Sequence, residues 1–352
     1  MNLKSKVNVY RRNITHSLTY SLGKKSTAKM QQKAAHFKVN RVLISRPNHR
    51  LGNMLLITPL VQEICETYPH CKIDLFVKGK IASIVFQNYP QVDRFIELPK
   101  KPFDHLLDYI GCWISLKKVK YDLIINVEKG SSSGRLSTIV ARGDFKFFGD
   151  SIEDSADKHA DSAHYAKYPV YNFRGFLESL NQTSLTGKVP VLDLKLNEEE
   201  ISRGKRDLEE VTQDSSRKTI AFFTFATGDK CYSEEWWSDF YALFHAEFKQ
   251  EFNLIEILPV ENISKLNHRL PEFYSKDIRE IAALMANCDL LLAADSGMMH
   301  LSSASLSPTI GLFSYTPIEM YGVYGRNNSS IHTHSQSQSD IIKEMRRIVS
   351  KS

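Results

Sequence analysis

Residues 289–325 constrain the fold of this chain more than any other stretch. Leu290–Ala294 is a continuous apolar run, which is typical of a strand buried on both faces. Asp295-Ser296-Gly297 follows, then an apolar helical pattern that carries His300, and then a second strand run at Pro308–Phe313. A strand that ends in Asp-Ser-Gly and opens a helix directs backbone N–H groups and the positive end of the helix dipole at one spot. That spot suits a phosphate.

The same alternation of strand and helix runs through most of the chain. Strands are expected at Arg41–Ser45, Lys72–Val77, Arg94–Leu98, Tyr121–Val127, Phe145–Gly149, Thr219–Thr224 and Asn253–Leu258. Helices are expected at Met54–Tyr68, Ile81–Asn88, Phe103–Val119, Leu136–Ala141, Phe173–Leu180, Glu198–Val211, Glu234–Phe248, Ile278–Ala286 and Ile341–Val349. This order predicts parallel sheets with helices on both faces. No GxGxxG follows the first strand, so the dinucleotide fingerprint is absent.

The two series of strands predict an α/β protein of two Rossmann-like domains that face a central cleft. A basic extension is expected at residues 1–38 and a first domain at 39–190. A second domain is expected at 191–335, and a C-terminal helix at 336–352. With 352 residues, of which 42% are hydrophobic, the chain is long enough for two cores.

Charge is distributed unevenly along the sequence. The first acidic residue is Glu63, and twelve Lys or Arg residues precede it. The rest of the chain has 34 Lys or Arg against 40 Asp or Glu, so the net charge of +6 comes from the N-terminal stretch alone. An acidic body argues against a nucleic-acid partner.

Within the basic extension, apolar residues recur at helical spacing: Leu3, Val7, Tyr10, Ile14 and Leu18. A basic helix with one apolar stripe is typical of a helix that lies on an anionic membrane surface. Two alternatives are a solvated tail and a mitochondrial targeting peptide.

Other features of the chain favour the cytoplasm. No apolar run approaches the ~18 residues of a membrane span, and no secretory signal precedes the body. The five cysteines are scattered, which is typical of reduced thiols in a cytoplasmic protein. We expect a cytoplasmic protein, with the extension as a peripheral contact at the inner face of the cell membrane.

Four segments of the chain carry a resemblance to a known family: RVLISRPNHRLGNMLLITPLVQEI, YDLIINVEKG, FATGDKCYSEEWW and SKDIREIAALMANCDLLLAADSGMMHLSSASLSPTIGLFSYTPIEMYGVYG. Together they resemble the ADP-heptose:lipopolysaccharide heptosyltransferases, which are inverting glycosyltransferases of the GT-B fold. The last segment is the most specific, since it matches the D-[TS]-G-x-x-H-L signature and the strand after it. The resemblance covers roughly residues 39–350. It implies a nucleotide-diphosphate sugar as co-substrate, a lipopolysaccharide or other anionic glycolipid as acceptor, and no further cofactor.

The resemblance places the donor diphosphate at the Asp295-Ser-Gly turn. Its growing negative charge would be met by the N–H groups of Ser296, Gly297 and Met298 and by Lys230. Thr227 and Gly228 would shape the loop that carries Lys230, and Glu261 would accept hydrogen bonds from the ribose. Asp295 would bind sugar hydroxyls, and His300 would orient the Asp295-Ser296 turn or contact a phosphate. The sequence has no Asp-x-Asp pair of the kind that holds a metal, so we expect none. Structural alternatives are a helix N-cap for Asp295 or Ser296, a core-edge histidine, and solvated charges for Lys230 and Glu261.

An inverting transfer needs a base that takes the proton of the acceptor hydroxyl. The family uses the Asp of an N-terminal Gly-Asp pair, and here that position is Asn53. An amide cannot act as this base near neutral pH. Three alternatives remain open: His49 on the same loop, with an unperturbed pKa of about 6.5; Asp295 from the other domain; or donor binding without turnover.

Two classes of function follow from these observations. The first is an inverting glycosyltransferase that moves a heptose or other sugar onto a cell-surface glycan. The second is a catalytically impaired, glycosyltransferase-like subunit that binds or scaffolds a glycan assembly system. Met298-Met299, and Ser314-Tyr315 in place of a frequent Gly-Pro, leave the sugar and the nucleotide of the donor open.

Overall fold

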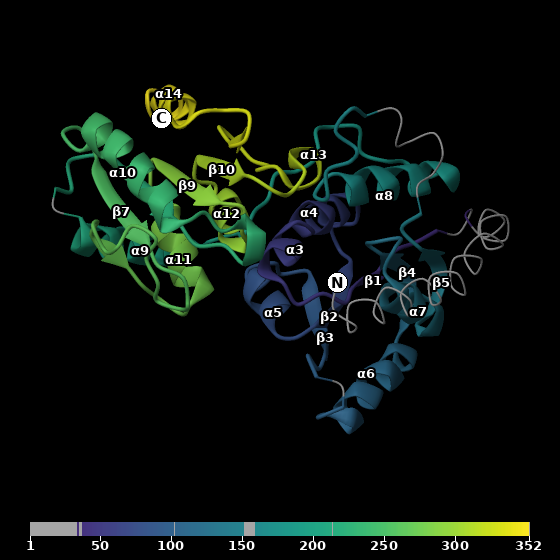
Figure 1. Cartoon of the computed structure of the whole chain (residues 1–352). Coiled ribbons are helices and arrows are strands. Elements are labelled where there is room, and N and C mark those ends of the chain that lie inside the picture. Colours follow the sequence, from purple (N-terminus) through teal and green to yellow (C-terminus); the bar gives the residue numbers. More distant parts are fainter. Residues whose placement is uncertain (1–33, 35–36, 102, 151–158, 213, 352) are drawn as a thin grey trace. The chain divides into compact units, whose positions relative to one another are not determined.

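A computed structural model of the protein describes residues 34, 37–101, 103–150, 159–212 and 214–351. The chain divides into two compact units (Figure 1). The first comprises residues up to His49 together with Pro59–Pro190, and the second comprises Arg50–Thr58 together with Val191–Ser352. None of the helices in the described ranges is both long and apolar enough to cross a membrane. The proposed stripe from Leu3 to Leu18 lies outside the described residues.

The first unit is built on a five-stranded parallel sheet in the order β3-β2-β1-β4-β5. Its strands are β1 (Arg41–Arg46), β2 (Lys72–Lys78), β3 (Val92–Leu98), β4 (Lys120–Asn126) and β5 (Arg142–Phe147). Its helices are α4 (Thr58–Thr67), α5 (Ile81–Val85), α6 (Leu106–Lys118), α7 (Ser132–Val140) and α8 (Tyr168–Ser179). The order reverses between β1 and β4, which places the switch point of the sheet there.

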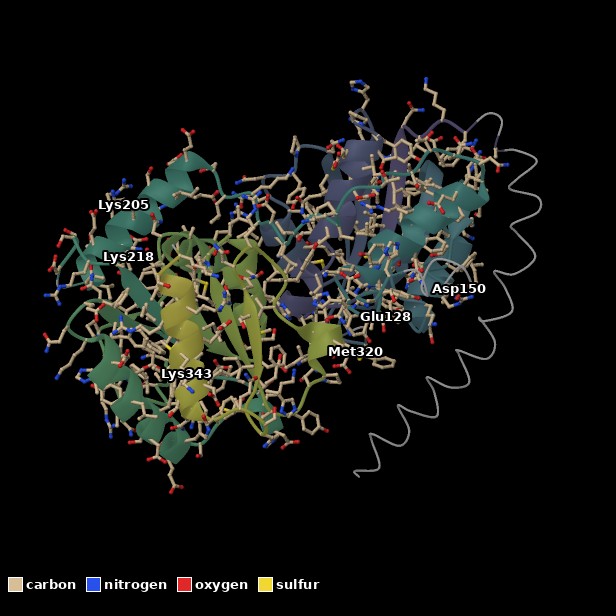
Figure 2. The ribbon with its side chains drawn as sticks, turned by 90° about the horizontal axis from the view of Figure 1, so that it is seen from above. Glu128, Asp150, Lys205, Lys218, Met320 and Lys343 are labelled. Carbon is tan, nitrogen blue, oxygen red and sulfur yellow. The ribbon has the colours of Figure 1, made fainter. Side chains whose placement is uncertain are left out.

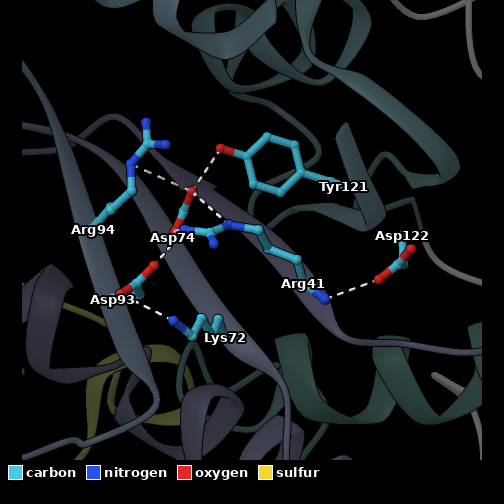
Figure 3. Close-up of polar contacts among 7 residues, drawn as sticks. All are labelled: Arg41, Lys72, Asp74, Asp93, Arg94, Tyr121 and Asp122. Atoms are coloured by element: carbon cyan, nitrogen blue, oxygen red, sulfur yellow. Dashed lines mark hydrogen bonds and ion pairs between the residues drawn. The ribbon is translucent and has the colours of Figure 1, made fainter. Parts of the chain in front are cut away.

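A network of side chains around one buried carboxylate links four neighbouring strands of this sheet (Figure 3). Asp74, on β2, is fully buried, and its Oδ1 accepts a hydrogen bond from Arg41 Nη2 at 2.7 Å. Tyr121 on β4 donates its hydroxyl to Asp74 Oδ2 at 2.8 Å, and Arg94 Nε lies 3.8 Å from the same oxygen. Burial and the neighbouring carboxylate raise the pKa of the Tyr121 hydroxyl, so it remains a donor. The network satisfies a charge that would otherwise be costly to bury.

The second unit has a six-stranded parallel sheet in the order β11-β10-β9-β6-β7-β8, which is the doubly wound order of a Rossmann fold. Its strands are β6 (Thr219–Phe223), β7 (Asn253–Ile257), β8 (Glu272–Phe273), β9 (Leu290–Ala294), β10 (Thr309–Phe313) and β11 (Ser329–His332). Its helices are α3 (Leu51–Leu55), α9 (Glu198–Val211), η2 (Gly228–Lys230), α10 (Glu234–Phe248), α11 (Ile278–Met285), α12 (Gly297–Ala304), α13 (Ile318–Tyr321) and α14 (Gln338–Val349). The predicted pair of Rossmann-like domains is therefore confirmed.

Two expected domain boundaries need correction. Gln338–Val349 is not a separate C-terminal piece, because Ile341, Met345 and Ile348 pack into the core of the second unit. That core is dominated by aromatic rings from β6 and α10, such as Phe222 and Phe244, whose centroids lie 4.2 Å apart.

The other correction concerns Arg50–Thr58, which belongs to the second unit although it was expected within 39–190. The reason is a close backbone contact between α3 and α12. A Cβ placed on Gly297 would lie 3.2 Å from Gly52 N, and one on Gly52 would lie 3.0 Å from His300 Cδ2. Gly52 and Gly297, which have no side chains, thus allow α3 to pack directly against α12.

The single helix expected at Met54–Tyr68 is in fact two helices, α3 and α4. Pro59 has no N–H, so it cannot donate to the Leu55 carbonyl four residues earlier. The Thr58 hydroxyl donates to that carbonyl instead, at 2.8 Å, and α4 begins there. The break allows α3 and α4 to belong to different units.

Candidate functional site

A pocket of about 920 Å³ opens at the carboxyl edge of the six-stranded sheet. All of its lining residues belong to the second unit. Most of them lie at or after the ends of β6, β7, β8, β9 and β10 or on α11. Helix α3 and its two cap residues add Arg50 to Asn53 and Leu56. Because β6 and β9 are the strands at which the order reverses, the pocket lies at the topological switch point. Its volume suits a ligand the size of a nucleotide sugar.

The start of α12 forms one wall of the pocket. Ser296 is the N-cap residue, with φ −150° and ψ 172°, and its side chain makes no capping hydrogen bond. The first N–H groups of a helix have no partner within the helix, so those of α12 are available to a ligand. The hydroxyls of Ser296 and Thr316, which both line the pocket, are also buried without a hydrogen-bond partner among the described residues. This wall presents donors and the positive helix end to one point.

Lys230 and Asp295 form an ion pair at the same wall. Lys230 Nζ lies 2.8 Å from Asp295 Oδ2, and the Asp295 side chain is only 6% exposed against 33% for Lys230. The ammonium group also lies 5.9 Å from the centre of the Tyr321 ring, which belongs to α13. Figure 2 labels Met320, the neighbour of Tyr321 on that helix. The carboxylate and the ring hold the lysine in place while part of its charge faces the pocket.

A buried hydrogen-bond network supports the loops behind this wall. Glu256 on β7 is fully buried; Thr224 Oγ1 donates to its Oε1 at 2.6 Å and Ser264 Oγ donates to its Oε2 at 2.5 Å. Lys265 N donates in turn to Thr224 Oγ1 at 3.3 Å. Burial raises the pKa of Glu256 even though both hydroxyls favour its charged form. The network joins β6 and β7 to the loop that carries Glu261.

Tyr232 anchors the loop that follows η2 and Lys230. Its hydroxyl lies 2.9 Å from Thr333 Oγ1, just after β11, and its ring packs 4.4 Å from the centre of Trp236. Burial raises the pKa of Tyr232, and the nearby Asp295 carboxylate adds to this effect. The phenol therefore stays neutral near pH 7 and keeps its hydrogen bond to the threonine.

The structure brings most of the expected site residues to one pocket. Those that line it are Asn53, Thr227, Lys230, Glu261, Asp295, Ser296, Gly297, Met298 and His300. Gly228 does not line it; with φ +66° it shapes the turn before Lys230. His49 is exposed, is the last residue assigned to the first unit before Arg50, and is not among the lining residues. The roles given to these residues remain predictions.

Several lining residues were not foreseen as site residues. Lys276 precedes α11, and Tyr315 to Pro317 and Tyr321 follow β10. Apolar side chains make another part of the wall: Leu51, Leu56, Phe223, Phe225, Leu258, Val260, Ile278 and Ile281. The signal that could have found Lys276 is its position directly before Asp277, the N-cap of α11.

Arg46 is the last residue of β1 in the first unit. Arg46 is buried and forms an ion pair with Glu128, in the loop after β4. Figure 2 labels Glu128 and also Asp150, which pairs with Arg135 at 2.8 Å. Arg46 is therefore already neutralised within its own unit.

Comparisons with known proteins show a likeness to one family of glycosyltransferases. Residues 275–347, which include α11 and the start of α12, match the family model described as glycosyltransferase family 9 (heptosyltransferase). Lipopolysaccharide heptosyltransferase 1 of Campylobacter coli is 24% identical over 287 residues, which are 76% of this chain and 82% of the relative. Lipopolysaccharide core heptosyltransferase OpsX of Haemophilus influenzae is 20% identical over 75% of this chain and 76% of its own length. The chain resembles the family 9 heptosyltransferases.

Solved structures of heptosyltransferase-like proteins share the fold. A family 9 glycosyltransferase from Veillonella parvula superimposes with a TM-score of 0.69 at 16% identity, covering 90% of this chain and 99% of its own. The E. coli heptosyltransferase WaaC with ADP gives a TM-score of 0.64 at 18% identity, covering 87% and 99%. The GT-B assignment is thereby confirmed.

Proposed function

We propose that this protein is an inverting glycosyltransferase that moves a sugar from a nucleotide-diphosphate donor to an anionic glycolipid acceptor. A heptose donor and a lipopolysaccharide acceptor are favoured by the named activities of its relatives. The observation that carries the proposal is the convergence of Lys230 and the uncapped start of α12 on one pocket. Of these two features, α12 lies within residues 275–347, which match the family model.

The pocket supports a diphosphate donor on electrostatic grounds. Negative charge grows on the diphosphate as the glycosidic bond breaks, and preorganised positive groups stabilise that charge. Lys230 supplies an ammonium group, and Ser296, Gly297 and Met298 supply N–H groups at the positive end of α12. No metal is needed to supply this charge. The apolar wall around Phe225 and Val260 suits a nucleobase, and Glu261 is available to the ribose hydroxyls.

The proton acceptor in this proposal is His49. Asn53 lines the pocket but cannot take a proton near neutral pH. Asp295 is buried and committed to Lys230, so we assign it to positioning that lysine rather than to proton transfer. His49 is exposed and lies four residues before Asn53, and its imidazole has the chemistry of a base at neutral pH.

A second function is favoured by one observation, the amide at position 53. In that case the protein binds a nucleotide sugar without turning it over and serves as a subunit of a glycan assembly system. The pocket, Lys230 and α12 would have the same binding role in both cases, so only turnover separates them.

Binding is tested first, by calorimetric titration with ADP. Lys230→Met is expected to weaken ADP affinity by about tenfold or more, since a hydrogen bond to a charged group contributes about 1.5–3 kcal/mol. Lys343→Met, at an exposed lysine on α14 that pairs only with Asp340 among the described residues, serves as the matched control and should bind like the native chain. Equal affinity of both variants would contradict the diphosphate assignment.

Turnover is tested by transfer from ADP-heptose to a lipopolysaccharide core acceptor. Transfer by the native chain that is lost in His49→Ala supports the relocated base. If only Asn53→Asp shows transfer, the natural chain is a binding protein and the enzyme proposal fails. Loss of transfer in Asp295→Ala together with loss of ADP affinity is the result expected for a residue that positions Lys230.

A further inference from the structure

Helix α6 of the first unit has an apolar face on each side. Its inner face is anchored in the core: Leu116 is fully buried, and the Trp113 ring packs edge-on against Phe76 at 5.3 Å. Cys112 Sγ donates to the Glu97 carbonyl at 3.3 Å, which fixes the helix to the end of β3. The rotation of α6 about its axis is therefore set by packing, and its outer face is turned to solvent by the same contacts.

The outer face of α6 is apolar where a surface helix is normally polar. At 100° per residue, Leu107 and Ile114 lie opposite the buried side, with Leu106 and Ile110 beside them. Leu107 is 85% exposed, Ile114 53%, and Phe103, just before the helix, 95%. Single exposed apolar side chains need no explanation, but a continuous group on one helix marks an interaction surface. We call Phe103, Leu106, Leu107, Ile110 and Ile114 the α6 patch.

Lysines lie in the sequence on both sides of the α6 patch: Lys100, Lys101, Lys117, Lys118 and Lys120. Lys120 is paired with Asp144 on β5, at 2.7 Å. Only two carboxylates lie on the same segment, Asp104 and Asp108, and they lie within 4 Å of Lys101 and His105 respectively. In the described part of the chain, Lys117 and Lys118 form no ion pair, and both are exposed. The patch is thus a short apolar surface with a basic rim in a body that is otherwise net acidic.

We propose that the α6 patch docks on a membrane surface that contains anionic lipid. A helix of 13 residues is too short to span a bilayer. Its apolar side chains would enter the headgroup boundary instead, while the lysines beside them contact lipid phosphates. A second copy of the chain would bring the same lysines to the contact, and like charges repel. Figure 1 shows α6 at the periphery of the first unit, after the edge strand β3.

This inference does not depend on the proposed transfer reaction, because it concerns binding without donor or acceptor. It is also separate from the basic extension at residues 1–38, which is present in every variant below. A readout that reports on α6 itself is therefore required.

The local test uses full-length Leu107→Trp and vesicles of phosphatidylglycerol with brominated acyl chains, which quench only fluorophores that enter the bilayer. We expect quenching of Leu107→Trp beyond that of the native tryptophans. Leu243→Trp, at an exposed apolar position on α10, is the matched control and should behave like the native chain. Quenching of Leu107→Trp no greater than that of Leu243→Trp would overturn the proposal.

The strength of docking is tested by vesicle flotation. Leu107→Glu with Ile114→Glu should lower partitioning by about tenfold or more relative to Leu243→Glu, because the burial of each apolar side chain is lost. Lys117→Gln with Lys118→Gln should lower it by about fivefold per lysine on phosphatidylglycerol, and not on phosphatidylcholine. A doubling of mass in solution that Leu107→Glu abolishes would instead identify a second copy of the chain as the occupant and overturn the membrane assignment.

Discussion

At the scale of single residues, Glu256 shows how burial and hydrogen bonding compete. Its carboxylate accepts hydrogen bonds from Thr224 and Ser264, which favour the charged form. Burial opposes them and dominates, so the pKa of Glu256 is raised in the folded protein. The folded state therefore binds a proton more tightly than the unfolded chain does.

This raised pKa sets the sign of a pH dependence. The contribution of Glu256 to stability should be fully present below its ordinary pKa and lost as pH rises through the folded value. We expect the free energy of unfolding of the native chain to fall relative to that of Glu256→Gln as the pH rises above 4.5, the ordinary pKa of a glutamate. Urea denaturation of both proteins at several pH values measures this difference in the free energy of unfolding.

Thr224→Val provides the control for this effect. It removes one hydrogen bond that favours the charged carboxylate, so the fall in stability with pH should be steeper than in the native chain. A difference between the native chain and Glu256→Gln that stays constant as the pH rises would show that burial does not dominate.

Candidate site residues that lie together in one short motif could be predicted from the sequence. Residues that are far apart in the sequence and come together only in the folded chain could not. Asp295-Ser-Gly is a strand end followed by a helix start, which is a local pattern. Lys276 reaches the pocket from the turn before α11, and Tyr321 reaches it from α13. The N-cap Asp277 marks a helix start after Lys276, but it does not show that this helix start lies beside α12. The Lys230–Asp295 ion pair could be predicted only from the pairing of β6 with β9, which the sequence does not show.

At the scale of elements, boundaries were predictable where the chain caps its own helices. The bounds of α9 match the expected range, because Asn197 and Glu200 form a capping box at its start. Gln338 begins α14 three residues earlier than expected, since the Ser337–Asp340 capping box lies in a Ser- and Gln-rich stretch that resembles a loop. The two-residue strand β8 is too short to have a pattern of its own.

Helices α9 and α11 approach so closely that only glycine fits between them. A Cβ on Gly204 would lie 2.1 Å from the Ala283 carbonyl carbon, and backbone cannot move aside easily. Gly204→Ala should lower the free energy of unfolding by about 3 kcal/mol. The midpoint of urea unfolding, followed by circular dichroism, measures this change.

Gly111→Ala on α6 is the matched control. A Cβ there meets no atom within 4 Å, so the same substitution in a helix should raise stability by about 0.5–1 kcal/mol. Equal effects of the two substitutions would show that the contact between α9 and α11 yields without cost.

At the scale of the whole molecule, the two units have separate sheets and cores, and the pocket belongs to one of them. Ligand binding should therefore stabilise the chain unevenly. At about 100 times its dissociation constant, a nucleotide ligand adds about 2.7 kcal/mol to the stability of the state that binds it.

We expect ADP to slow amide hydrogen exchange in α3, in the loop that contains η2 and in the first turn of α12. The strands β1 to β5 should exchange as they do without ligand, because they hold no pocket residue. Hydrogen exchange followed by mass spectrometry measures both sets of peptides. Protection that appears in the five-stranded sheet and not at α12 would place the ligand elsewhere.

The contact between Gly52 and Gly297 also limits how such a protein can be recombined. A chimaera joined at residues 190 and 191 would combine the α12 of one parent with the α3 of another, so one wall of the pocket would come from the wrong sequence. Any bulkier residue on either side would then separate two backbones that have no space between them. An exchange of the ligand-binding half that keeps the pocket whole must transfer Arg50–Thr58 together with Val191–Ser352.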